Sequence, residues 1–435
     1  MRRLLTYLGV PVLAVAAALV LVLAGGVVGN GHRAAAPPAT APVATDRLAD
    51  AIARAQDRLH TLPKDWRTWA ALASAYVEQA RVSANPTYYQ KAQGAAEQSL
   101  TLHPEGNTDA LIALGALANA RHDFSAARDH ARAALLVDAY SADAYGVLAD
   151  AQTQLGDSAA ATDAVQHMLD LRPGLAAYAR ASYDLEQHGR VDEASDLMRR
   201  ALAAATDPHD IAFCRNQLGE LAWQGGDLAG AQREYTAGLA ADPTSIALHR
   251  GQAQVDAATG HLDTALSGYA EVTRRAPTPP YLAEYAELLR AAGRTTDADA
   301  QLSLAGAAQQ LFAANGGVDG LAAASLAIAT GRPADAVTAA RAEWARRQHV
   351  DVADTLAWSL HAAGQDIEAL GYARRVAATG ARNASYAYHL GAIEAALGQR
   401  DAARADLNRA LRTNPYFSPL EVPVARRLLT EAGSR

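Results

Sequence analysis

Three residues in one short stretch, Asp354–His361, have the types found in a hydrolytic active site. Asp354, Ser359 and His361 offer an acid, a hydroxyl and an imidazole, the groups of a serine-hydrolase triad. Such a triad needs the serine oxygen within hydrogen-bond reach of the histidine. Ser359 and His361 are two residues apart in a helical pattern, and residues at that spacing do not face each other. The local triad is therefore excluded, and we expect a protein that is not an enzyme.

A different subset of the stretch does share a helical face. Asp354, Trp358 and His361 follow one another at spacings of four and three residues, which places them on one side of an α-helix. This face is a candidate for binding another protein rather than for catalysis.

Other chemical signatures do not occur in the sequence. It contains no phosphate-binding glycine loop, no His-Glu-x-x-His, no cysteine pair and no calcium loop. The thirteen histidines are scattered, which favours surface positions. The single cysteine, Cys214, lies in an apolar helical context and is expected to be a buried thiol. The sequence predicts no cofactor and no metal.

Composition favours an all-α protein. Of the 435 residues, 50% are hydrophobic but only 6% are aromatic, so most of the apolar surface comes from alanine and leucine, which are strong helix formers. The formal net charge of −7, with both signs interspersed, gives no basic stripe for nucleic acid.

The first residues have the pattern of a membrane segment. Arg2 and Arg3 precede an uncharged apolar run over residues 4–28, which as a helix of roughly 37 Å could cross a hydrocarbon core of about 30 Å. Residues 1–30 are therefore expected to be a transmembrane anchor or, as the alternative, a cleaved signal peptide. The two arginines favour a cytoplasmic N-terminus and a body outside the cytoplasm. Residues 31–45 are expected to be an Ala/Pro linker.

A repeat organises the rest of the chain. Its core is Gly-x-x-x-x-Ala, as in Gly156 to Ala161, and the alanines are separated by 33 to 38 residues. These alanines are Ala127, Ala161, Ala194, Ala231, Ala265, Ala298, Ala336, Ala369 and Ala403. A period near 34 residues with a glycine inside it predicts two helices per unit. The glycine ends the first helix, the small alanine lets the second helix pack closely, and a proline often follows the second helix.

The units together predict the organisation of the body. We expect a solenoid over residues 46–418, with about ten repeats over 66–418 after a half-unit at 46–63. A capping helix is expected within residues 419–435. The units within residues 279–349 are degenerate.

The repeat resembles the tetratricopeptide repeat (TPR) family. In the first unit the resemblance is carried by Trp69, Leu72, Ala73, Tyr76, Ala92, Ser99, Leu100 and Pro104. In the tenth it is carried by Leu390, Gly391, Ala403, Leu407, Ala410, Leu411 and Pro415. The run NPYFSPLEVPVARRLL looks like the capping end of actinobacterial members. The resemblance implies a bacterial, right-handed superhelical solenoid that acts as an interaction scaffold.

The resemblance also implies a binding surface, because family members line a concave groove with particular positions of each first helix. Those positions here are Asn119, Asp150, Tyr183, Asn216, Glu220, Trp223, Arg250, Gln254, Glu287, Arg290, Asp354, Trp358, His361 and Tyr388. We expect them to contact a partner protein or peptide; the alternative is an idle, solvated inner face. Overall we expect a single-pass scaffold at the cell membrane with its body outside the cytoplasm, or a secreted one if the signal is cleaved. The alternative function is an envelope assembly or transport accessory that binds a small ligand or metal.

Overall fold

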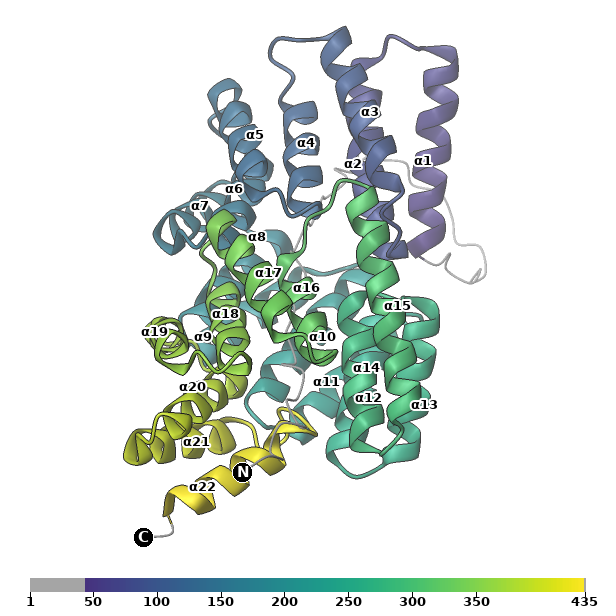
Figure 1. Ribbon diagram of the computed structural model, residues 1–435. Coiled ribbons are helices and arrows are strands. Elements are labelled where there is room, and N and C mark those ends of the chain that lie inside the picture. Colours follow the sequence, from purple (N-terminus) through teal and green to yellow (C-terminus); the bar gives the residue numbers. More distant parts are fainter. Residues whose placement is uncertain (1–43, 434–435) are drawn as a thin grey trace.

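The computed structural model describes residues 44–433, and over this range the chain forms 22 α-helices and no strand (Figure 1). The predicted all-α helical-repeat solenoid is confirmed, while its right-handed sense stays a prediction. The expected membrane segment at residues 1–30 lies outside the described residues. Among the helices of residues 44–433, none is long and apolar enough to cross a membrane.

Twenty helices form ten hairpins, numbered here as repeats 1 to 10. In repeats 1 to 5 the hairpins are α2–α3 (Trp66–Ser83, Tyr88–Leu102), α4–α5 (Thr108–Ala120, Phe124–Val137), α6–α7 (Ala142–Leu155, Ser158–Leu171), α8–α9 (Leu175–Gln187, Val191–Ala204) and α10–α11 (Pro208–Gln224, Leu228–Ala241). In repeats 6 to 10 they are α12–α13 (Ile246–Ala258, Leu262–Arg275), α14–α15 (Pro279–Ala291, Thr295–Ala314), α16–α17 (Gly320–Ala329, Pro333–Arg346), α18–α19 (Val350–Ala362, Asp366–Ala377) and α20–α21 (Ala384–Ala396, Arg400–Thr413). Helix α1 (Ala44–Thr61) precedes this array and α22 (Glu421–Gly433) follows it.

Local sequence explains where the helices begin and end. Asp157 caps α7 by accepting a hydrogen bond from the amide of Ala160, which satisfies one of the free N–H groups at the helix start. Gly156, just before it, adopts φ of 83°, a left-handed conformation that glycine reaches without steric cost. In repeat 2 the same place is taken by His122 with φ of 60°.

Small residues set the distance between the two helices of a repeat. Ala127 and Ala231 are 0% exposed, as the repeat pattern predicts. A Cβ on Gly219 would lie 2.2 Å from the ring of Tyr235, so only glycine allows α10 and α11 to approach this closely. Successive repeats then stack through a series of largely alanine and leucine clusters along the array.

Consecutive turns of the superhelix touch each other. Val318 N donates to Arg121 O at 3.0 Å and Gln348 N donates to Leu155 O at 3.2 Å. Further along, Asn414 Nδ2 donates to Trp223 O at 2.8 Å. These inter-turn contacts join the turns inside repeats 2, 3 and 5 to the loops before repeats 8 and 9 and before α22. Figure 1 shows the result, with the green helices α16 to α18 lying against the blue helices of repeats 2 to 4. Repeats about six units apart in the chain are therefore in contact, and this contact between turns is called closure below.

The degenerate repeats contribute to this closure. Helix α15 has 20 residues, whereas the other second helices have 12 to 15. Its extra length brings the ring of Phe312 to 6.2 Å from that of Tyr89 and 5.3 Å from that of His122. The end of repeat 7 is thus held against repeats 1 and 2.

Candidate interaction site on the inner face

The fourteen predicted contact residues, here called the inner-face residues, all lie on first helices of repeats. None of them is exposed, and eight are buried: Asn119, Trp223, Arg250, Gln254, Glu287, Asp354, Trp358 and Tyr388. The other six are partly buried: Asp150, Tyr183, Asn216, Glu220, Arg290 and His361. The alternative of an idle, solvated inner face does not hold for the two tryptophans, because Trp223 is 7% and Trp358 only 1% exposed. Trp223 packs in a cluster formed by repeats 5 and 6, and Trp358 packs against Tyr388 and His389 of repeat 10, so neighbouring repeats cover both rings.

In repeats 3 and 4 the inner face contains a buried ion pair. Arg180 donates from Nε and Nη2 to the two carboxylate oxygens of Asp150, both at 2.8 Å. The two side chains are 5% and 10% exposed. Burial raises the pKa of Asp150, and the guanidinium of Arg180 opposes that rise. The bidentate geometry compensates part of the cost of removing both charges from water.

A second, larger ionic cluster spans repeats 5 to 7. Arg250 on α12 contacts Glu220 on α10 at 2.8 Å and Glu284 on α14 at 2.7 Å. Each carboxylate also accepts a tyrosine hydroxyl, from Tyr235 at 2.7 Å and from Tyr269 at 3.1 Å. One guanidinium therefore ties three successive first helices together, which fixes the curvature of this part of the inner face.

A third cluster lies where repeats 9 and 10 meet α22. His389 Nδ1 is 2.9 Å from both oxygens of Asp354, and its Nε2 is 3.8 Å from Glu421 Oε1. All three side chains are almost completely buried. Burial lowers the pKa of His389, but the carboxylates of Asp354 and Glu421 outweigh it and raise the pKa to about 10. The imidazole is thus a cation that bridges two acids, and the ring of Trp358 stacks on it with centroids 4.1 Å apart.

Asp354, Ser359 and His361, the three residues with hydrolase-like side chains, do not bind one another as a triad. Ser359 Oγ donates to the carbonyl of Thr355 at 2.7 Å and is buried. His361 Nδ1 instead contacts Asp366 Oδ1 at 2.5 Å. Ser359 and His361 therefore have separate partners and do not form the local triad.

Several inner-face polar atoms are buried without a partner. They include Tyr183 Oη, Asn216 Oδ1 and Gln254 Oε1. On the same helix as Tyr183, burial raises the pKa of Glu186 to about 7, against the hydrogen bond from Gln224. Buried polar atoms normally have hydrogen-bond partners, so this stretch of the inner face is suited to receive one.

The cysteine and two of the histidines are buried in the interior. Burial raises the pKa of the Cys214 thiol to about 12, so the predicted buried thiol is present and unreactive. The expected surface location of histidines is wrong for His349 and His389, which are 4% and 0% exposed. Within residues 44–433 no group of three or more His, Cys, Asp or Glu side chains could hold a metal ion.

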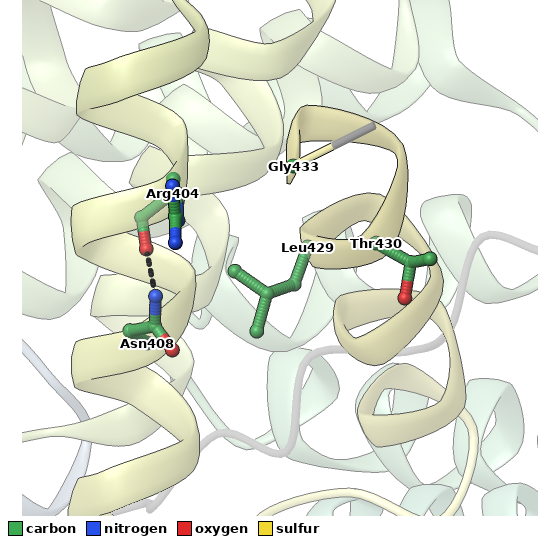
Figure 2. Close-up of a pocket in the computed structure, with 5 residues that line it drawn as sticks. All are labelled: Arg404, Asn408, Leu429, Thr430 and Gly433. Atoms are coloured by element: carbon green, nitrogen blue, oxygen red, sulfur yellow. Dashed lines mark hydrogen bonds between the residues drawn. The ribbon is translucent and has the colours of Figure 1, made fainter. Parts of the chain in front are cut away.

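An open groove lies away from the inner face, between α21 and α22. Figure 2 shows Arg404 and Asn408 on one side and Leu429 and Thr430 on the other, around a volume of about 380 Å³. Asn408 Nδ2 donates to the carbonyl of Arg404 at 2.8 Å. The groove is shallow and has no buried polar group aimed into it, so it does not define a site.

The sequence reading missed Arg180, Glu284, His389 and Glu421. Three of these pair with residues close to one repeat away: Asp150 with Arg180, Arg250 with Glu284, and Asp354 with His389. Opposite charges spaced by about one repeat on first helices could therefore have predicted these ion pairs from the sequence. Glu421 had no such signal, because α22 belongs to no regular repeat.

Comparisons with known proteins agree with the helical hairpin as the unit. Residues 384–417, which contain α20 and α21, match the tetratricopeptide repeat family. No curated protein matches the chain.

Three solved structures are similar at low sequence identity. A thermophilic TPR protein from Thermus thermophilus is 19% identical, covers 43% of this chain and 98% of its own, and has a TM-score of 0.38. A tetratricopeptide repeat protein from Parabacteroides merdae is 16% identical, with 60% and 99% covered and a TM-score of 0.35. The pilF protein of Pseudomonas aeruginosa is 18% identical, with 55% and 90% covered and a TM-score of 0.34.

Proposed function

We propose that this protein is a non-enzymatic scaffold that binds another protein or peptide on the inner face of its superhelix. The supporting observation is the set of buried polar atoms without partners in repeats 4 to 6: Tyr183 Oη, Asn216 Oδ1 and Gln254 Oε1. A surface that serves packing alone is apolar or fully hydrogen-bonded, because an unsatisfied buried polar group costs about 1–3 kcal/mol. A bound segment that supplies the missing hydrogen bonds would remove that cost.

The chemistry of these atoms describes the partner. Asn216 Oδ1 and Gln254 Oε1 are acceptors, and the half-buried carboxyl group of Glu186 lies near Tyr183 on the same helix, α8. The matching partner is an extended peptide that presents backbone N–H groups and hydroxyl or amide side chains. A strongly acidic peptide would add like charges to this surface and is disfavoured.

We also infer that the scaffold is attached to a membrane. The support is the uncharged run over residues 4–28, the two preceding arginines and the Ala/Pro linker at 31–45. The body would then lie outside the cytoplasm. Membrane fractionation and protease treatment of intact cells test this placement. Recovery of the full chain in the soluble fraction, or a body cut only after lysis, would contradict it.

A photo-crosslinking experiment tests the binding surface itself. A photoreactive phenylalanine replaces Tyr183 on the inner face, and in a matched variant it replaces Tyr140, which is 81% exposed on a loop. After irradiation of cells, a specific crosslinked protein is expected from position 183 and not from position 140. Crosslinks at 140 alone, or at neither position, would remove the inner face as the binding surface.

A further inference from the structure

The segment Asn414–Glu421 differs from the other loops between helices in how many repeats it contacts. Its side chains Asn414, Phe417, Ser418 and Glu421 are 0–5% exposed. It links α21 to α22, so contacts with repeat 10 are expected. It also contacts repeats 5 and 7, and it is linked to repeat 9 through His389 of repeat 10.

The first interaction holds the segment to repeat 5. Asn414 Nδ2 donates to the carbonyl of Trp223 at 2.8 Å, a carbonyl at the end of α10 that also accepts the amide of Gly226 at 2.9 Å. The chain approaches closely here, because a Cβ on Gly226 would lie 3.1 Å from Pro415 Cδ and 3.2 Å from Thr413 O. Asn414 therefore uses its side chain as a ligand for the turn of repeat 5.

The second interaction holds it to repeat 7. Ser418 Oγ donates to Glu287 Oε1 on α14, across 131 residues of sequence. The same oxygen accepts the amide of Glu421 at 2.9 Å and so caps α22. Glu287 is 1% exposed, and its carboxyl group accepts the hydroxyl of Ser418 in the interior.

The third interaction joins it to repeats 9 and 10. Glu421 is 3.8 Å from His389, which is bound in turn to Asp354. Phe417 packs on Tyr388 with ring centroids 5.5 Å apart. Two inner-face residues of the last repeats, Asp354 and Tyr388, are thus engaged by this one segment, directly or through His389.

A terminal cap needs to cover only the repeat before it, whereas this segment contacts repeats 5, 7 and 10 and reaches Asp354 of repeat 9 through His389. We propose that Asn414–Glu421 is an intramolecular ligand that closes the superhelix and competes with an external partner for the inner face. The proposal rests on the function proposed above. The partner competes with the segment, and the competing peptide has related chemistry: an amide donor for Trp223 O, a hydroxyl donor for Glu287 and an aromatic ring for Tyr388.

The test breaks the segment's two hydrogen bonds in the full chain. Asn414→Ala/Ser418→Ala is compared with Asn408→Ala/Ser303→Ala, whose positions lie outside the segment on α21 and α15. Circular dichroism checks that the helical content is retained. In the first variant, amide hydrogen exchange in α10 and α14 is expected to be faster by about tenfold or more, since each lost bond weakens closure. The control variant should exchange as the wild type does.

A peptide of residues 413–421 added in trans provides the second measurement. Fluorescence anisotropy is expected to show binding to Asn414→Ala/Ser418→Ala at least about tenfold tighter than to the wild type, because the wild-type site is already occupied. Adding Glu287→Ala to that variant should lower its affinity for the peptide. Equal exchange in both double variants, or equal peptide affinity for variant and wild type, overturns the proposal.

The outcomes separate the two proposals. A crosslinked partner at position 183 with no effect of the Asn414→Ala/Ser418→Ala variant retains the scaffold and rejects the intramolecular ligand. Opening and peptide binding without any crosslinked partner retains the closure and rejects the inner face as a partner site.

Discussion

Gly189 packs against the backbone carbonyl of Gly380 in the next turn of the superhelix. A Cβ on Gly189 would lie 2.2 Å from the carbonyl oxygen of Gly380, although the two residues belong to repeats 4 and 9–10. The contact leaves no room for a side chain, so the spacing of the turns depends on a hydrogen atom at this position. Gly156 has the same relationship with the carbonyl of Gln348 at 2.4 Å.

Gly189→Ala should therefore destabilise the protein more than the same change elsewhere in the repeat. Gly364 is the matched control: both glycines have φ of 73°, but a Cβ on Gly364 meets nothing within 4 Å. Each substitution costs about 1–2 kcal/mol for the left-handed conformation. Gly189→Ala should cost about 1–3 kcal/mol more, because the second turn must move. Urea unfolding measures the difference. Equal losses would mean that the turns do not touch in solution.

The His389 cluster makes a prediction about a buried charge. His389→Gln removes the cation and leaves Asp354 and Glu421 in the interior, which should cost about 3–5 kcal/mol. Because the loss comes from the uncompensated carboxylate, Asp354→Asn/His389→Gln should recover a large part of it. Urea unfolding of the two single variants and the double variant gives the coupling free energy. A double variant whose loss equals the sum of the single losses would exclude this ion pair.

Glu287 makes the closed state sensitive to pH. Burial, followed by the charge of Glu421, raises the pKa of Glu287 well above 4.5, while the hydroxyl of Ser418 and the backbone of Leu420 act in the opposite direction and the nearby Glu284 adds to the rise. A raised folded-state pKa contributes stability that is complete below the unfolded value and is lost as pH rises through the folded value. Closure should accordingly weaken as pH increases above 4.5.

Glu287→Gln tests that dependence. Glutamine keeps an oxygen for Ser418 but cannot lose a proton. At pH 4.5 the closed state of the variant should therefore be no more stable than that of the wild type. At each higher pH the stability of the variant should rise relative to that of the wild type. Hydrogen exchange in α14 and α22 between pH 5 and 8, corrected for intrinsic rates, measures this. A wild-type and variant difference that stays constant over the range would contradict the assignment. Glu186, whose pKa is about 7, remains in both proteins as a common background.

The sequence predicted the hairpin unit because glycine and alanine have local roles that repeat with the period. It also placed the inner-face residues on first helices, since position in the repeat determines the helix face. It did not predict closure. Gly156 and Gly260 occupy the same place in the motif, yet only Gly156 meets another turn. Whether two turns touch depends on small rotations between repeats that accumulate over about six units, and no short pattern encodes their sum.

The contact made by α15 leads to the last prediction. Phe312 packs on Tyr89 and His122, whereas its neighbour Leu311 is 48% exposed. Phe312→Ala should cost about 2–3 kcal/mol, and the loss should be local, because repeats in a solenoid contact mainly their neighbours. Exchange should accelerate in the end of α15 and the turn of repeat 2, with α12 and α13 unchanged. Leu311→Ala, which removes an exposed side chain, should leave both regions protected. If Phe312→Ala instead accelerated exchange along the whole chain, the superhelix would unfold as one unit and its inter-turn contacts could not open separately.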